Sequence, residues 1–209
     1  MRIDSIAAQS DRSGRHLVKF SDGSTMRLYR QTVEDFGLYI GLELGEDQAA
    51  KLREAAGQMS AKMRAVRIVA ASNVSKEDLQ QRLVRKGESP RQAREAVQWM
   101  EELDLVDDEK TARLLVERCI AKGYGRSRAK QVLYEKKIPN DIWDAVLEDY
   151  PDQTEKIADF LRTRLHEGWQ ERDLKRAIDA LLRRGHSYNQ IRQGLKLLEV
   201  DQDSFREEF

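Results

Sequence analysis

Residues 75–87 carry the stretch SKEDLQQRLVRKG, and two later stretches of the chain share its pattern. The counterparts are GRSRAKQVLYEKK at residues 125–137 and DLKRAIDALLRRG at residues 173–185. When Leu83, Leu133 and Leu181 are aligned, the three stretches are separated by 50 and 48 residues. Self-similarity at a nearly fixed period is stronger evidence of architecture than any local motif, and it predicts a repeat protein.

Each of these stretches forms the middle part of a larger unit. A further helical segment follows it, and the alignment places Ala93, Trp143 and Ile191 at equivalent positions. A helix with one apolar face precedes it, and in the first unit this helix begins near Glu46 and runs to about Ser72. Turn signals separate the second helix of each unit from the third, at residues 87–90, 137–139 and 185–187. Units this small bury too little apolar surface alone, so we expect them to stack as an elongated array.

The first 30 residues contain the convincing strand signals of the chain. Three pairs of apolar residues carry them: Ile3 and Ile6, Val18 and Phe20, and Met26 and Leu28. Residues 21–23, Ser-Asp-Gly, are typical of a turn between two strands. We predict a small three-stranded ribbon, which needs the following helices for stability because its apolar face is narrow.

The predicted fold is therefore mainly α, with three tandem three-helix repeats and a small N-terminal β-ribbon. Residues 1–45 form the ribbon and a short helix. The three repeats occupy residues 46–106, 107–150 and 151–209, and the last of them includes an acidic C-terminal end.

The charge of the chain is balanced overall but unevenly distributed. The formal net charge of zero argues against a protein that binds nucleic acid indiscriminately. The balance is nevertheless a sum of alternating blocks. The net charges are +7 for residues 110–137, −6 for 138–160, +5 for 161–198 and −4 for 199–209.

Several features bear on the cell compartment. The single cysteine, Cys119, cannot form an internal disulfide. The sequence shows neither a secretory signal nor an apolar run long enough to cross a membrane. We expect a cytoplasmic, monomeric protein.

The sequence offers few candidates for catalysis, and we expect no catalytic centre, cofactor or metal. The three histidines, His16, His166 and His186, are not brought together by any pattern, and we interpret them as surface or capping residues. Cys119 falls on an apolar helix face and is interpreted as core. The pair Asp107 and Asp108 is interpreted as a helix N-terminal cap.

The stretch at residues 122–128, Lys-Gly-Tyr-Gly-Arg-Ser-Arg, combines glycines with cations, as phosphate-binding loops do. It lacks the full phosphate-loop pattern and follows no predicted strand. The favoured interpretation is a helix that stops at Gly123, a short turn, and a new helix that begins near Ser127.

Basic clusters remain as the candidate interaction surface. Such faces on successive helices suit an extended partner with negative or patterned charge, such as a protein filament or a nucleic-acid backbone. The candidate partner-binding or nucleic-acid-binding residues are Arg82, Arg85, Lys86, Arg113, Arg118, Lys122, Arg126, Arg128, Lys130, Arg172, Lys175, Arg176, Arg183 and Arg184.

The run from Leu103 to Asp108, Leu-Asp-Leu-Val-Asp-Asp, leads into Thr111 and Ala112 and resembles the central signature of the RecX family. The preceding Leu79, Leu83, Lys86, Gly87, Ala96 and Val97 are similar to that family too, as are the following Lys122, Gly123, Arg126 and Leu133. The chain departs from the family pattern at three positions. The family usually has glycine at the positions of Asp104 and Lys137, and an aromatic residue at that of Thr111.

The resemblance implies a function as well as a fold. It implies tandem three-helix repeats without a catalytic centre. It also implies binding to the RecA filament on single-stranded DNA, where such proteins mostly inhibit strand exchange, ATP hydrolysis and coprotease activity. Weak direct contact with DNA is compatible with this role.

The alternative is a stand-alone DNA-binding helical protein that contacts phosphate through its basic blocks. Tight, steeply salt-dependent binding to naked DNA in the absence of RecA would favour this alternative.

Overall fold

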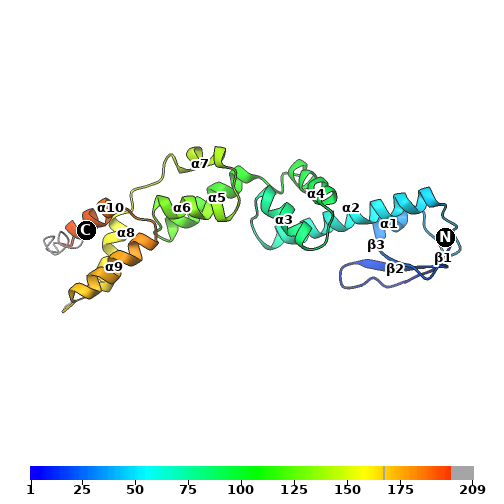
Figure 1. Ribbon diagram of the computed structural model, residues 1–209, viewed down its shortest axis with the longest axis horizontal. Coiled ribbons are helices and arrows are strands. Elements are labelled where there is room, and N and C mark those ends of the chain that lie inside the picture. The colour runs from blue at the N-terminus through cyan, green and yellow to red at the C-terminus, as the bar shows by residue number, and fades with distance from the viewer. Residues whose placement is uncertain (167, 199–209) are drawn as a thin grey trace. The chain divides into compact units, whose positions relative to one another are not determined.

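The computed structural model describes residues 1–166 and 168–198 of the 209-residue chain. These residues form three strands and ten helices (Figure 1), so the predicted mainly α fold with an N-terminal ribbon is confirmed. The chain divides into two compact units, Met1–Val106 and a second unit that begins at Asp107. No helix among the described residues is both long and apolar enough to cross a membrane.

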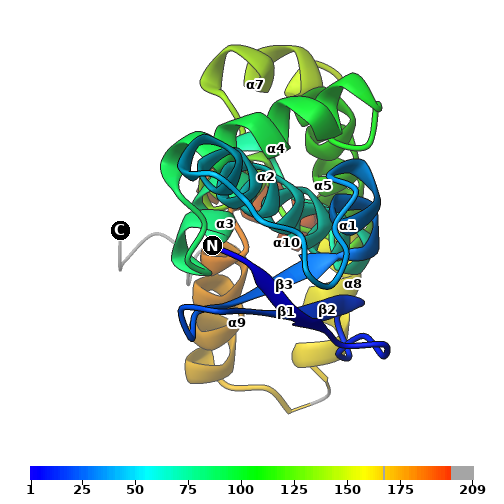
Figure 2. The ribbon, with the colours of Figure 1, turned by 90° about the vertical axis from the view of Figure 1, so that its right-hand side faces the viewer.

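The first unit begins with a three-stranded antiparallel sheet, whose strands are drawn in blue in Figure 2. Its strand order is β1-β2-β3. The strands are β1 (Ile3–Ile6), β2 (Arg15–Phe20) and β3 (Thr25–Tyr29), and they contain all three of the predicted apolar pairs. One face of the sheet packs with α1 (Arg30–Asp35) and with the first half of α2 (Glu46–Ala71). Leu52 of α2 is fully buried in this core. The ribbon therefore packs against a helix, which it needs because its apolar face is narrow.

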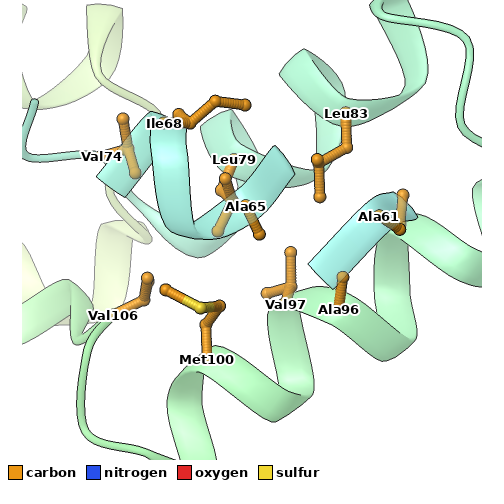
Figure 3. Packing of buried hydrophobic residues seen from close by; sticks show 11 residues of the cluster. Ala61, Ala65, Ile68, Val74, Leu79, Leu83, Ala96, Val97, Met100 and Val106 are labelled. Atoms are coloured by element: carbon orange, nitrogen blue, oxygen red, sulfur yellow. The ribbon is translucent and has the colours of Figure 1, made fainter. Parts of the chain in front are cut away.

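The second half of α2 packs with α3 (Lys76–Arg85) and α4 (Pro90–Glu102). Figure 3 shows the buried side chains of this core converging from the three helices. Ala61 and Ala65 on α2 and Ala96 on α4 are small, so these two helices can approach closely, while Leu83 and Met100 fill the remaining space.

The second unit contains two groups of three helices, each with its own core. The first group is α5 (Asp108–Ala121), α6 (Arg126–Glu135) and α7 (Asn140–Leu147). The second group is α8 (Thr154–Arg164), α9 (Glu171–Arg183) and α10 (Tyr188–Lys196). The predicted acidic end, residues 199–209, lies outside the described residues.

The turns between α3 and α4, α6 and α7, and α9 and α10 share one conformation. Each has four residues, and the second is in the left-handed region, with φ of +94° at Gly87, +56° at Lys137 and +84° at Gly185. The N–H groups of Glu88, Ile138 and His186, each the third residue of its turn, donate to the carbonyls of Leu83, Leu133 and Leu181 at 3.0–3.2 Å. This is the Schellman arrangement that ends a helix. The acceptors are the three leucines that the sequence alignment superimposed, so the structure supports that alignment.

Candidate functional site

The residues that suggested chemistry are accounted for by packing. Cys119 lies in the core of α5, α6 and α7, and burial raises the pKa of its thiol, so the thiol stays protonated. Asp107 caps α5, because its carboxylate accepts a hydrogen bond from the Lys110 N–H at 3.0 Å. Within residues 1–166 and 168–198, no group of three or more His, Cys, Asp or Glu side chains is placed to hold a metal ion.

The glycine-rich stretch at residues 122–128 joins two groups of helices. Helix α5 ends at Ala121, Gly123 has a φ of +65°, and α6 begins at Arg126, close to the predicted start at Ser127. The N–H of Gly125 donates to the carbonyl of Arg184 at 2.8 Å. A Cβ atom at position 125 would lie only 2.1 Å from the carbonyl oxygen of Gly185. Glycine is required here because two backbone segments touch, and this contact explains the motif without a phosphate.

His186 takes part in the same junction. Its side chain is buried, and Nε2 lies 2.9 Å from the carbonyl oxygen of Gly123. A carbonyl only accepts hydrogen bonds, so Nε2 carries the proton, and Nδ1 has no partner among the described residues. Burial lowers the pKa of His186; the hydrogen bond to Gly123 opposes this effect, and the charge of Arg184 adds to it. His186 was interpreted as a surface or capping residue, and the surface interpretation is wrong because the side chain is buried. Local sequence could not indicate this, since its partner lies 63 residues away.

The first basic cluster borders a cleft in the first unit. Arg82 and Lys86 line this cleft, whose volume is about 450 Å³. Three further cations line it as well: Arg15 of β2, and Arg64 and Arg67 of α2. The other lining residues are Ser13, Tyr29, Ser60, Ile68, Ala71 and Ser72. We call this feature the cationic cleft. Arg85, the third member of the cluster, is exposed but does not line it.

Sequence reasoning missed Arg15, Arg64 and Arg67. The two α2 residues follow Ser60 at helical spacings of four and seven, which places all three on one face of the helix. That periodicity could have identified the α2 side of the cleft. The closeness of β2 and α3 to this face is a long-range contact, and no local pattern indicates it.

Carboxylates near the cationic cleft are held by their own partners. Glu88 has only 7% of its side chain exposed; it lies 2.9 Å from Nε of Arg64 and accepts a hydrogen bond from Ser60 at 3.0 Å. Asp78 is 2.7 Å from Arg82, and Asp11 is 2.9 Å from Arg15. Five cations therefore face three carboxylates, and none of the three carboxylates lines the cleft.

Arg67 and Lys86 are the two lining cations that have no carboxylate partner in the described part of the chain. Arg67 donates to the Tyr29 hydroxyl and, at 3.1 Å, to the Met63 carbonyl. No carboxylate among the described residues lies within ion-pair distance of either cation.

The candidate residues of the second unit divide into two sets. Five of them contact a neighbouring side chain: Arg113 pairs with Glu109, Arg128 with Glu135 and Arg176 with Asp173, while Arg184 lies over the ring of Phe160 and Lys122 over the ring of Tyr124. The other six share an exposed side chain, and Lys175 among them also has an interaction partner: Arg118, Arg126, Lys130, Arg172, Lys175 and Arg183. The structure therefore does not gather all of the predicted residues into one site, and their role in binding stays a prediction.

Comparison with known proteins adds three findings. Residues 107–147, which contain α5, α6 and α7, match the family model described as RecX, second three-helix domain. The Regulatory protein RecX of Vibrio campbellii is 24% identical over 146 residues, which is 68% of this chain and 94% of that protein. The corresponding protein of Vibrio parahaemolyticus is 23% identical over the same shares of the two chains.

Two solved structures share the fold. A crystal structure of regulatory protein RecX has a TM-score of 0.62 at 20% identity, covering 96% of this chain and 99% of that one. RecX from Lactobacillus salivarius has a TM-score of 0.59 at 19% identity, covering 70% and 99%. The family match, the relatives and the solved structures agree with one another, and all of them support a RecX family protein.

Proposed function

We propose that this protein binds the RecA filament on single-stranded DNA and regulates it, mostly by inhibiting its recombinase, ATPase and coprotease activities. The observation that carries the proposal is the match of residues 107–147 to the RecX second three-helix domain. That segment forms three helices around a common core, and both Vibrio relatives are named regulatory proteins.

A regulator of this kind acts through binding energy alone. It shifts the partner between states by as much as its affinities for those states differ. Inhibition therefore requires tighter binding to an inactive or disassembling filament than to the active one. The exposed cations of α5, α6 and α9 are charged groups that such a binding surface can use.

The test is a titration of the purified protein into RecA filaments on single-stranded DNA, with ATP hydrolysis and strand exchange as readouts. We expect both rates to fall as the protein approaches the RecA concentration. Unchanged rates at comparable concentrations would contradict the proposal.

A charge-removal variant tests the surface itself. Arg126→Gln with Lys130→Gln removes two exposed cations of α6 and should weaken the inhibition. Arg128 is left intact, because it packs against Gly185 and pairs with Glu135 at 3.1 Å. The matched control is Arg94→Gln with Arg162→Gln, which removes the same charge from exposed helix positions outside the predicted set. Equal inhibition by the variant and the control would show that α6 is the wrong surface.

A further inference from the structure

We propose that the cationic cleft of the first unit binds a phosphate group, carried either by the phosphodiester backbone of a nucleic-acid strand or by a free nucleotide. The proposal goes beyond the regulation of RecA, because it assigns the cleft a ligand that is recognised without RecA.

The cleft is assembled from segments that are distant in sequence. Arg15 lies at the start of β2, Tyr29 at the end of β3, and Arg67 on α2. Arg82 and Lys86 come from the last turn of α3 and the residue that follows it. These elements all belong to the first unit and share packed contacts, so the cations are presented by a folded scaffold.

The charge of the cleft suits an anion. Five cations line it, and three of them pair with carboxylates that lie outside the lining. The cleft therefore has an excess of two positive charges. An entering anion would therefore meet no lining carboxylate. Two excess charges are sufficient for one phosphate monoester or for two neighbouring phosphodiesters.

The donors that remain favour phosphate oxygens. A guanidinium has five N–H groups, and the hydrogen bonds from Arg67 to Met63 and Tyr29 leave some of them unused. Lys86 adds an exposed ammonium, and Ser13 and Ser72 contribute hydroxyl groups to the lining. Phosphate oxygens only accept hydrogen bonds, so a lining of cations and hydroxyls matches them.

The lining also argues against two other ligands. Only Ile68 and Ala71 among the lining residues have aliphatic side chains, so an acidic peptide would find no apolar pocket for anchoring side chains. Tyr29, the one aromatic residue in the lining, is only 9% exposed, so its ring cannot serve as a platform for a base. Recognition should therefore be of phosphate and independent of base sequence.

The test variant is Arg67→Gln combined with Lys86→Gln in the full chain. These are the two cations without a carboxylate partner, so their removal leaves no buried carboxylate without its cation.

Removal of Arg64 or Arg82 would leave the buried Glu88 or Asp78 without its cation and would destabilise the fold. The matched control is Arg30→Gln with Arg91→Gln, which removes two exposed arginines of the same unit that do not line the cleft. Thermal unfolding followed by circular dichroism checks that the variants remain folded.

Binding is first measured without RecA, by fluorescence anisotropy of a labelled oligothymidine at several salt concentrations. We expect the cleft variant to bind about tenfold more weakly than the parent and the control at low salt. The slope of log affinity against log salt should fall in magnitude by about 1.4, since each neutralised phosphate contributes about 0.7 on single strands.

A second measurement separates the two sources of phosphate. Amide resonances of the lining residues are followed by nuclear magnetic resonance during titration with inorganic phosphate and with a nucleoside monophosphate. Saturable shifts that the cleft variant abolishes, together with unchanged oligothymidine binding, would support the free nucleotide as the source. Loss of oligothymidine affinity in the cleft variant supports the nucleic-acid strand.

Two results would overturn the proposal. One is that the cleft variant and the control behave alike with every phosphate-bearing probe. The other is that a glutamate-rich peptide binds the parent, and loses this binding in the cleft variant, while no phosphate probe does so. Because RecA is absent from these experiments, either failure would leave the proposed regulation of RecA intact.

Discussion

Two non-glycine residues occupy left-handed backbone positions, Asp104 with a φ of +58° and Lys137 with a φ of +56°. Both follow the end of a helix, where glycine is the common residue because a Cβ atom is unfavourable in this conformation. Both are also positions at which the RecX resemblance predicts glycine. At these two positions Asp and Lys replace the expected glycine, and the left-handed backbone conformation of the turn is kept.

Replacement of Lys137 by glycine should relieve this backbone strain. We expect Lys137→Gly to raise the free energy of unfolding by about 0.5 kcal/mol, since the relief of backbone strain exceeds the cost of the added flexibility of the unfolded chain.

The matched change is Gly87→Ala at the equivalent turn, where nothing lies within 4 Å of the new Cβ. It should lower stability by about 1 kcal/mol through φ alone. Urea unfolding followed by circular dichroism measures both changes, and a destabilised Lys137→Gly would show that the side chain outweighs the strain.

The buried ring of His186 should make stability depend on pH. Its pKa in the folded protein is lower than its ordinary value of 6.5, first because burial disfavours the charged ring. Well above pH 6.5 the ring is neutral in both states and contributes no pH dependence. As pH falls below 6.5 the unfolded chain binds a proton before the folded one does, so stability decreases down to the folded pKa. Unfolding midpoints measured between neutral pH and about pH 5 should show this decrease.

His186→Gln supplies the control for that pH dependence. Glutamine can donate to the Gly123 carbonyl but does not titrate in this range. The variant should lose the part of the pH dependence that begins near 6.5. An identical pH profile in parent and variant would assign the effect to other groups.

At the scale of elements, the helices and strands followed from local patterns. The apolar pairs of the ribbon lie within the three observed strands, and α2 begins at the predicted Glu46. These features are set by hydrophobic periodicity and by caps, which sequence displays directly. The contact between Gly125 and the turn after α9 could not be predicted, because it depends on how two groups of helices pack.

Glycines at positions 57 and 125 should respond oppositely to the same substitution. At Gly125, a new Cβ would lie 2.1 Å from a backbone carbonyl, so Gly125→Ala must displace the turn and should cost about 2 kcal/mol or more. At Gly57, inside α2, the nearest atoms belong to the flexible side chain of Gln92, which can move away. Gly57→Ala should therefore stabilise α2 by about 0.5–1 kcal/mol through helix propensity. The thermal unfolding midpoints of both variants test these opposite expectations. A lower midpoint for Gly57→Ala would mean that the side chain of Gln92 cannot rearrange.

At the scale of the whole molecule, part of the candidate surface was predictable from sequence. The basic clusters revealed Arg82 and Lys86, because runs of cations are visible in the chain. The same reasoning included Arg113 and Arg184, which interact with Glu109 and Phe160 and are partly occupied by these contacts. The sequence shows which residues are charged, but it does not show which of them contact other side chains in the folded protein. The cationic cleft required the folded structure, since its cations come from β2, α2 and α3.

The cationic cleft and the exposed cations of α6 belong to different units and share no residues. If both contact the RecA filament on DNA, their contributions to binding free energy should add to within about 0.5 kcal/mol, as is usual for independent sites. The measurement is a double-mutant cycle on half-inhibitory concentrations. It combines Arg67→Gln and Lys86→Gln with Arg126→Gln and Lys130→Gln. Additive losses would mean that two separate surfaces hold one partner. If the α6 pair alone weakens inhibition and the cleft pair has no effect, the cleft serves its phosphate ligand independently of RecA.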